Sequence, residues 1–347
     1  MRGKSLRIIG FCALLLLACA GFASAAPKLP VVGISTGSSG TSWRNIMIAA
    51  LDSVGKEYKA AGKIADYIMV NNVTNGDATE QANIIRDFIS KGVNIILLNP
   101  NSPDALNGVI KEAQDAGILV VSFDATVTAP NVLNVTLDHY AWNLKNAEWI
   151  ASTLKSGNAI QIYGLDGHPA NNARIQATAD VLKKYPNIKL IANTSGYWDQ
   201  TKSKEVAAQL IGSGQKIDAV FTQDGEAYGV LSAFLDAGKL PKVMFGDPGT
   251  AFFKEWKKLR DKKADFKACA QPNPPGIGGT GFRMALSLYN GKTFKDNVLK
   301  NGIFYYKVGM FITDANFDQG WNLLKDKADD YLLSEIMPQA QVDALFK

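Results

Sequence analysis

Short apolar runs and longer amphipathic stretches alternate along the chain from residue 31 onward. The apolar runs, most of them rich in Val and Ile, cover 31–35, 64–70, 94–98, 118–123, 159–163, 188–192, 217–221 and 242–245. The stretches with helical periodicity cover 43–61, 79–91, 105–116, 141–154, 172–184, 202–212, 226–237 and 251–263. Apolar runs without strict alternation are typical of parallel strands that are covered on both faces. The pattern therefore predicts βαβ crossovers and a parallel α/β sheet.

The strand–helix pattern occurs twice, which predicts two lobes. One copy covers 31–124 and the second covers 159–247, and each ends in an apolar run followed by an acid, Asp124 and Asp247 respectively. Two similar Rossmann-like lobes that face one another would enclose one cleft. Because ligands of open parallel sheets bind beyond the carboxyl ends of the strands, we expect the functional residues at those ends.

The N-terminus has the features of a secretory signal peptide. Three basic residues precede an apolar run at 8–22, and Ala23-Ser24-Ala25 follows with small residues at the spacing of a cleavage site. We expect residues 1–25 to be removed and the protein to be exported. An alternative interpretation takes Leu16-Leu17-Ala18-Cys19 as a lipoprotein site, although Leu at its middle position matches such sites poorly.

Composition without the signal peptide limits the partners and the fold. The formal net charge falls from +5 to +2, so nothing indicates nucleic acid or an anionic membrane surface as a partner. The remaining chain of roughly 320 residues exceeds what one core usually supports, which again favours two lobes. Cys269 is then the only cysteine, so no internal disulfide is expected. No later apolar run is long enough to span a membrane.

Polar and aromatic residues follow the predicted strands. These segments cover 35–43, 99–101, 124–126, 164–172, 197–199, 223–226, 247–250 and 271–275. They contain no His–Cys cluster with metal-ligand spacing and no G-x-S-x-G nucleophile motif, so we expect neither a metal site nor an enzyme. Carboxylates and amides can pair with sugar hydroxyls, which both donate and accept hydrogen bonds. The faces of aromatic rings can stack on the apolar faces of a sugar.

Two weaker signals are interpreted as structural. The segment 276–281 matches G-x-G-x-x-G, but it comes late in the chain and lacks the βαβ unit of a nucleotide site. We expect its glycines to allow close packing near a hinge, and we expect no cofactor. His139 and His168 are the only histidines and have no second His or Cys nearby in sequence, which argues against a metal site.

The strand ends also carry family motifs. Asn99-Pro100-Asn101-Ser102-Pro103, Val121-Ser122-Phe123-Asp124, Phe221-Thr222-Gln223-Asp224 and Phe245-Gly246-Asp247 resemble the type I periplasmic binding proteins, above all the ribose- and galactose-binding group. The resemblance implies two α/β lobes, joined by three hinge crossings, that close on a ligand. It implies an N-terminal lobe of 26–137 plus 272–304 and a C-terminal lobe of 138–271 plus 305–347. It gives no role to the tail from 314 to 347.

The resemblance also implies a set of ligand-binding residues. They are Ser39, Thr41, Trp43, Arg44, Asp124, Asn172, Arg174, Trp198, Asp224, Asp247 and Gln271. Trp43 and Trp198 match the stacking positions of the two lobes. Asp124 and Asp247 match the acids at the strand ends, although aspartates in such places also cap turns.

Two departures limit what the resemblance implies about the ligand. Asn172 and Ala125 stand where the ribose-binding proteins carry arginine, and Arg44 is a candidate to replace one of them. The sequence therefore indicates a sugar or polyol and does not identify which one.

The expected function is solute capture for an ABC importer. A monomer in the periplasm would bind a monosaccharide or polyol by hinge closure and then dock on a membrane permease. Alternatives are a sensor that serves a chemoreceptor or kinase, a binder of another solute such as a nucleoside, and a glycoside hydrolase that uses Asp124 and Asp247. A transcription regulator of the same fold would need a helix-turn-helix where this chain has its signal peptide.

Overall fold

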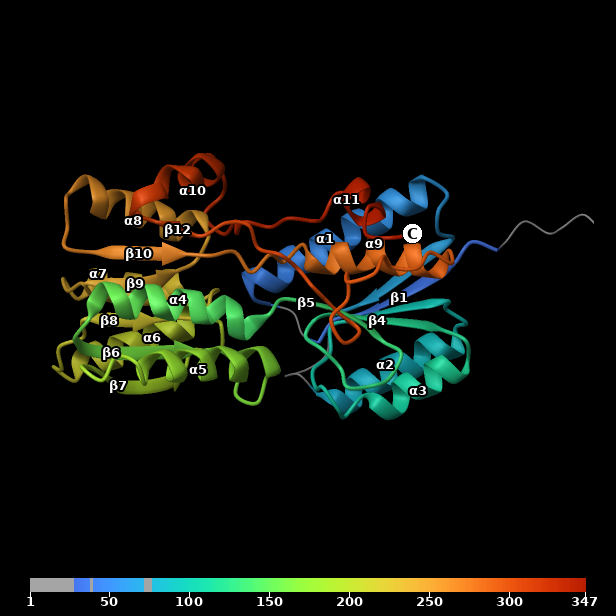
Figure 1. The fold of residues 1–347 in the computed structure, drawn as a ribbon, viewed down its shortest axis with the longest axis horizontal. Coiled ribbons are helices and arrows are strands. Elements are labelled where there is room, and N and C mark those ends of the chain that lie inside the picture. Colours follow the sequence, from blue (N-terminus) through green and yellow to red (C-terminus); the bar gives the residue numbers. More distant parts are fainter. Residues whose placement is uncertain (1–27, 38–39, 72–76) are drawn as a thin grey trace, which may run out of the picture.

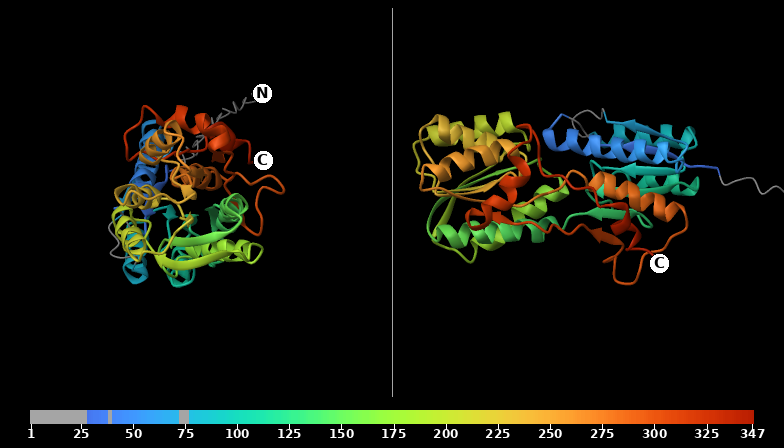
Figure 2. Two further views of the ribbon diagram at one scale, coloured as in Figure 1. Left: turned by 90° about the vertical axis from the view of Figure 1, so that its left-hand side faces the viewer. Right: turned by 90° about the horizontal axis from the view of Figure 1, so that it is seen from above.

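The protein consists of two α/β lobes that lie side by side along its longest axis (Figures 1 and 2). The computed structural model describes residues 28–37, 40–71 and 77–347. The predicted signal peptide and Ser39 therefore lie outside the described residues. Each lobe is built around one sheet, as the repeated strand–helix pattern predicts, and each sheet has six strands.

The N-terminal lobe has an all-parallel sheet with the strand order β11-β5-β4-β3-β1-β2. Its strands are β1 (Val31–Ser35), β2 (Asp66–Val70), β3 (Ile95–Leu98), β4 (Leu119–Asp124), β5 (Leu133–Thr136) and β11 (Ile303–Tyr305). Its helices are α1 (Ser42–Ala60), α2 (Ala78–Ser90), α3 (Asn107–Asp115), α9 (Ile277–Tyr289) and α11 (Gln339–Asp343). Helices α1 and α9 cover one face of the sheet, and α2 and α3 cover the other (Figure 1).

The C-terminal lobe has the strand order β12-β10-β9-β8-β6-β7, in which only β12 is antiparallel to its neighbour. Its strands are β6 (Gly157–Tyr163), β7 (Ile188–Ser195), β8 (Ala219–Phe221), β9 (Val243–Gly246), β10 (Lys267–Ala270) and β12 (Ile312–Thr313). Its helices are α4 (His139–Leu154), α5 (Pro169–Leu182), α6 (Gln200–Gly212), α7 (Ala227–Asp236), α8 (Thr250–Asp261) and α10 (Phe317–Leu324). The core with Trp142 lies under α4 and α5, and the core with Trp256 lies under α6, α7 and α8.

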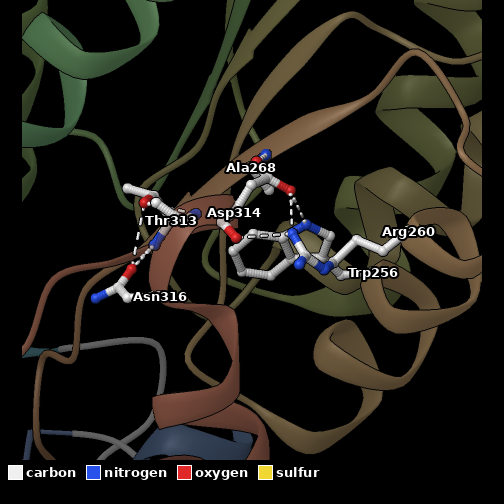
Figure 3. A network of polar contacts seen from close by, with 7 residues as sticks. Trp256, Arg260, Ala268, Thr313, Asp314 and Asn316 are labelled. Atoms are coloured by element: carbon white, nitrogen blue, oxygen red, sulfur yellow. Dashed lines mark hydrogen bonds and ion pairs between the residues drawn. The ribbon is translucent and has the colours of Figure 1, made fainter.

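The chain passes between the lobes at the three predicted hinge crossings. These lie between β5 and α4, between β10 and α9, and between β11 and β12. The third crossing is fixed in the C-terminal lobe by Asp314 (Figure 3). The carboxylate of Asp314 accepts hydrogen bonds from the Trp256 indole at 3.0 Å, from Arg260 at 3.0 Å and from the backbone N–H of Ala268 at 3.2 Å.

The predicted lobe boundaries are wrong for the C-terminal tail. Helix α10 packs on the C-terminal lobe, but the chain then returns, and α11 packs on α9 in the N-terminal lobe (Figure 1). Val342 and Phe346 are buried in the core of that lobe, and Phe346 stacks on Phe294 with ring centroids 4.2 Å apart. The tail therefore adds a fourth crossing, and its last residues belong to the N-terminal lobe because they cover apolar surface there.

The glycines of 276–281 allow close packing, as the sequence predicts. A Cβ atom on Gly276 would come within 2.1 Å of the Glu335 carbonyl oxygen, and one on Gly278 within 3.1 Å of Leu51. Both glycines lie at the start of α9, next to the hinge. Backbone and side chains from three segments can meet there only because these positions have no side chain.

Candidate ligand-binding cleft

A large cavity lies between the two lobes at the carboxyl ends of their strands. Its volume is about 1040 Å³, at the upper end of the range of roughly 300–1,000 Å³ that small-molecule sites occupy. Its walls are formed by Gly40, Thr41, Trp43, Arg44, Asn101, Asp124, Leu165, Asp166, Gly167, His168, Ala170, Arg174, Tyr197, Trp198, Asp199, Lys202, Asp224, Gly225 and Asn273. Seven of the predicted site residues, from both lobes, are among them.

The start of α1 supplies three of these residues in the N-terminal lobe. The Thr41 hydroxyl caps the helix by accepting a hydrogen bond from the backbone N–H of Arg44 at 3.3 Å. The buried Arg44 guanidinium donates to Asn99 Oδ1 at 2.6 Å, and Asn99 Nδ2 donates to Asp124 Oδ2 at 3.2 Å. Arg44 and Asp124 are thus held in one polar chain at the cavity wall.

Asp124 is the acid of the N-terminal wall. It ends β4 with a φ of 65°, a left-handed conformation that aspartate tolerates better than most residues. Burial raises the pKa of its carboxyl group, while the nearby cations Arg44 and Arg174 act in the opposite direction. Because Arg174 belongs to the other lobe, this carboxylate is an electrostatic partner across the cleft.

Arg174 is the corresponding cation of the C-terminal wall. Its Nη1 donates to the Gln223 carbonyl oxygen at 2.5 Å, and its Nη2 lies 3.0 Å from His139 Nδ1. The guanidinium lies 4.4 Å from the centre of the Trp142 ring, which is typical of a cation–π contact. Burial lowers the pKa of Arg174, and the carboxylates of Asp224 and Asp124 oppose that effect.

Trp198 forms an aromatic surface of the same wall. It has a φ of 54°, and its indole N–H donates to Gln223 Oε1 at 3.2 Å. The ring lies so close to Gly164 that a Cβ there would come within 1.9 Å of it, and the ring of His168 meets it edge-on at 5.0 Å. These contacts hold the indole in one orientation at the cavity.

Asp224 lies beside Arg174 in the loop before α7. It has a φ of 81°, it is 4% exposed, and its Oδ1 has no hydrogen-bond partner among the described residues. Burial, with the like charge of Asp247 nearby, raises the pKa of Asp224 well above its ordinary value. A buried carboxyl oxygen without a partner is costly, which makes Asp224 a strong candidate to receive a ligand hydroxyl.

Asp247 does not line the cavity. Its Oδ1 accepts hydrogen bonds from the backbone N–H groups of Gly225 at 2.7 Å and Ala227 at 3.2 Å, and its Oδ2 accepts from Tyr228 at 3.0 Å and from the Gln200 side chain at 3.1 Å. The residue lies at the end of β9, behind the loop that carries Asp224. Asp247 therefore has a structural role, but it holds the loop before α7 and the first turn of that helix, and not the turn that follows it in sequence.

Asn172 and Gln271 also lie away from the cavity wall. Asn172 is exposed on α5, and its side chain donates to the Gly167 carbonyl oxygen at 3.5 Å. Gln271 is buried in the second crossing, and Asn273, two residues further on, lines the cavity in its place. The Asn273 carbonyl oxygen accepts a hydrogen bond from the Trp43 indole at 2.7 Å, so the first aromatic wall residue is tied to the hinge.

Several wall residues were not predicted from the sequence. Asn101, Asp166, His168, Tyr197, Lys202 and Asn273 all line the cavity. All but Lys202 lie in the predicted strand-end segments, so position after a strand was the available signal. His168 was considered only as a metal ligand, but the structure shows it as the N-cap of α5. Burial, with Arg44 and Arg174 nearby, lowers the pKa of His168 to about 3, so its ring is neutral.

The described part of the chain holds no group of three or more His, Cys, Asp or Glu residues placed to bind a metal ion. Within the same residues no helix has the length and apolar character needed to cross a membrane. Cys269 is fully buried in β10, and burial raises the pKa of its thiol well above the ordinary value. The chemistry that the described walls offer is therefore hydrogen bonding, charge and aromatic contact.

Comparison with known proteins identifies the family. Residues 32–293 match the family model described as "Periplasmic binding protein domain". The chain belongs to this family. It is 28% identical to the D-allose-binding periplasmic protein of Escherichia coli K12 over 222 residues, which cover 61% of this chain and 70% of that protein. It is 27% identical to the ribose import binding protein RbsB of Salmonella typhimurium over 237 residues, which cover 67% and 78%.

Solved structures of the family share the fold of this periplasmic binding protein. An ABC transporter solute binding protein from Thermobispora bispora superimposes with a TM-score of 0.80 and 26% identity, covering 91% of this chain and 94% of the other. A galactofuranose binding protein superimposes with a TM-score of 0.70 and 23% identity, covering 87% of this chain and all of the other. The predicted family and two-lobed fold are thereby confirmed.

Proposed function

We propose that this protein is the solute-binding component of an ABC importer and that its ligand is an uncharged monosaccharide or polyol. The observation that supports this most is an acid and an arginine on each lobe, Asp124 with Arg44 and Asp224 with Arg174, around one cavity that also contains two tryptophans. The names of the relatives support the same class, since they bind D-allose and import ribose.

The chemistry of the walls fits an uncharged, hydroxyl-rich ligand. Three cationic side chains and four acidic ones line the cavity, namely Arg44, Arg174, Lys202, Asp124, Asp166, Asp199 and Asp224. Because the two signs nearly balance, the cavity gives little advantage to a ligand with a net charge. Hydroxyl groups donate to carboxylates and accept from guanidinium groups, so one kind of ligand group satisfies both kinds of wall residue.

Closure of the lobes would complete the binding site. Trp43 and Arg44 contact the ligand from the N-terminal lobe, and Arg174, Trp198 and Asp224 contact it from the C-terminal lobe. A ligand that touches both walls binds the closed form more tightly than the open form, and that difference in affinity drives closure. The closed protein, exported to the periplasm as a monomer, then presents its ligand to a membrane permease and releases it chemically unchanged.

Thermal unfolding with a panel of sugars tests the ligand class. D-ribose, D-allose, L-arabinose, xylitol and myo-inositol are compared with adenosine and with an amino acid, because a ligand that binds only the folded protein raises the melting temperature. We expect at least one sugar or polyol to raise it and to be recovered intact after incubation. A shift with adenosine or the amino acid alone would refute the proposed ligand class, and conversion of the sugar would refute a pure binding function.

Substitution of the two tryptophans in the cavity wall tests the site by the same thermal-unfolding assay. Trp198→Ala and Trp43→Ala each remove a ring from the cavity, and each should weaken sugar binding by about tenfold or more. Trp149→Ala serves as the control, because Trp149 lies on α4 and is not part of the cavity wall. Undiminished affinity in both cavity variants would refute the stacking roles.

A further inference from the structure

The fourth crossing is a short segment held firmly at both of its ends. In the C-terminal lobe the tail pairs with the start of α8: the backbone N–H of Thr250 donates to the Tyr331 carbonyl oxygen at 2.9 Å, and that of Leu333 donates to the Pro248 carbonyl oxygen at 2.9 Å. Leu332 is buried and packs on Gly249, where a Cβ would come within 2.7 Å of it. This first anchor directly follows Asp247, at the ligand-facing edge of the lobe.

The second anchor is the start of α9 in the N-terminal lobe. The backbone N–H of Met337 donates to the Thr280 hydroxyl at 2.9 Å, and the side chain of Ile336 packs on Gly279, where a Cβ would come within 3.1 Å of it. Further along, Val342 and Phe346 are buried in the core of that lobe. The tail end is therefore an integral part of the N-terminal lobe and cannot leave it without exposing apolar surface.

Only three residues, 334–336, separate Leu333 from Met337. Four steps along an extended chain span at most about 14 Å, so the two anchors cannot move further apart than that while both remain in place. Glu335 also contacts the other crossings. Its carbonyl oxygen lies against Gly276 of the second crossing, and the Tyr306 hydroxyl of the third crossing donates to it at 3.5 Å.

We propose that residues 333–337 act as a strap that limits how far the two lobes can open. Opening by rotation about the other crossings separates or twists the starts of α8 and α9, and the strap joins these two points directly. Because the strap is short and is packed on its neighbours at Glu335, it restricts this rotation even without ligand. The protein would then sample a narrower range of open forms than the three hinge crossings alone permit.

Lengthening the strap tests this proposal without disturbing either anchor. Inserting Gly-Ser-Gly-Ser between Ser334 and Glu335 adds about 13 Å of reach. The same insertion after Gly291 is the matched control, because that exposed turn follows α9, has a φ of 80° and has no atoms within 4 Å of a Cβ placed there. Small-angle X-ray scattering of the ligand-free proteins then compares their radii of gyration.

We expect the strap insertion to increase the radius of gyration and broaden the distance distribution relative to the control insertion. Ile336→Gly, which removes the contact with Gly279, should shift both quantities in the same direction but by less, and it keeps the test available if the insertion variant does not melt cooperatively. Curves for both strap variants that coincide with those of the wild type and the control would overturn the proposal. Because no ligand is used, the outcome is independent of the proposed function.

Discussion

At the scale of single residues, buried acids are the unusual feature of this protein. Asp124, Asp224, Glu226 and Asp247 are all buried at the ends of the strands, where burial raises the pKa of each carboxyl group. Arg174 is the cation that opposes these shifts at three of them. Asp124 and Asp224 are the two that line the cavity, and acids kept in such surroundings reduce the stability of the ligand-free protein, which is typical of residues retained for binding.

The pH dependence of stability should reveal the charge of Asp224. Its pKa in the folded protein lies above the ordinary value of 3.8, so the folded state binds the proton more tightly than the unfolded state does. The free energy of unfolding contributed by this group is therefore highest below about pH 4 and falls as the pH rises through the folded pKa. The variant Asp224→Asn has no titrating carboxyl group at this position, so its free energy of unfolding does not fall for this reason as the pH rises.

The comparison of Asp224→Asn with the wild type isolates that group from the other titrating residues. The free energy of unfolding of the variant relative to that of the wild type should increase as the pH is raised from 4 to 8. The increase is about 1.4 kcal/mol for each unit by which the folded pKa exceeds the unfolded one, and melting temperatures measured over this range check it. A difference that stays constant over this pH range would show that the pKa of Asp224 is not raised.

At the scale of secondary-structure elements, the ends of strands and the starts of helices hold the site in place. The loop from Gln223 to Glu226 carries Asp224, and the oxygens of Asp247 hold this loop and the first turn of α7. The negative charge of Asp247 lies at the positive end of the helix dipole, which stabilises it there despite its burial. Asp247 thus positions Asp224 without reaching the cavity.

Asp247→Ala should affect stability first. The variant leaves the backbone N–H groups of Gly225, Ala227 and Tyr228 without their acceptor, which should lower the free energy of unfolding by about 2 kcal/mol. Chemical denaturation measures this change, and Asp236→Ala, at the exposed end of the same helix, serves as the comparison. Unchanged stability combined with lost sugar binding would instead indicate that Asp247 touches the ligand.

Sequence patterns predicted the elements better than the side chains within them. All eight apolar runs became strands, because parallel strands buried on both faces leave a clear signal. Four strands were missed, namely β5, β10, β11 and β12, because they are short and lie at or next to the hinge crossings. The resemblance placed Asn172 and Gln271 at the site. Whether their side chains face the cavity depends on the orientation of the first turns of α5 and of the second hinge crossing, which the sequence pattern does not show.

The tail shows a second limit of sequence patterns. The resemblance placed all of 305–347 in the C-terminal lobe, and no pattern in the tail shows that the chain changes lobes after Leu333. That change depends on α9 and the core of the N-terminal lobe, on which the end of the tail packs and whose residues are distant from it in sequence. Packing that depends on residues far apart in sequence does not produce a periodic pattern of hydrophobic residues in the tail itself.

At the scale of the whole molecule, two lobes joined by four connections line one cavity between them. Each lobe has its own cores, so each can move as a rigid unit. The cavity of about 1040 Å³ is lined from both lobes, and its charged residues are electrostatically coupled across it. We propose that the lobes close on a sugar or polyol by hinge motion.

Small-angle X-ray scattering with and without ligand tests that claim most directly. The sugar or polyol that gives the largest rise in melting temperature is added at saturation to the wild type and to Trp198→Ala. We expect the radius of gyration of the wild type to fall on binding and that of the variant to fall less at the same concentration. A ligand that binds the wild type tightly and leaves its radius of gyration unchanged would contradict capture by closure of the lobes.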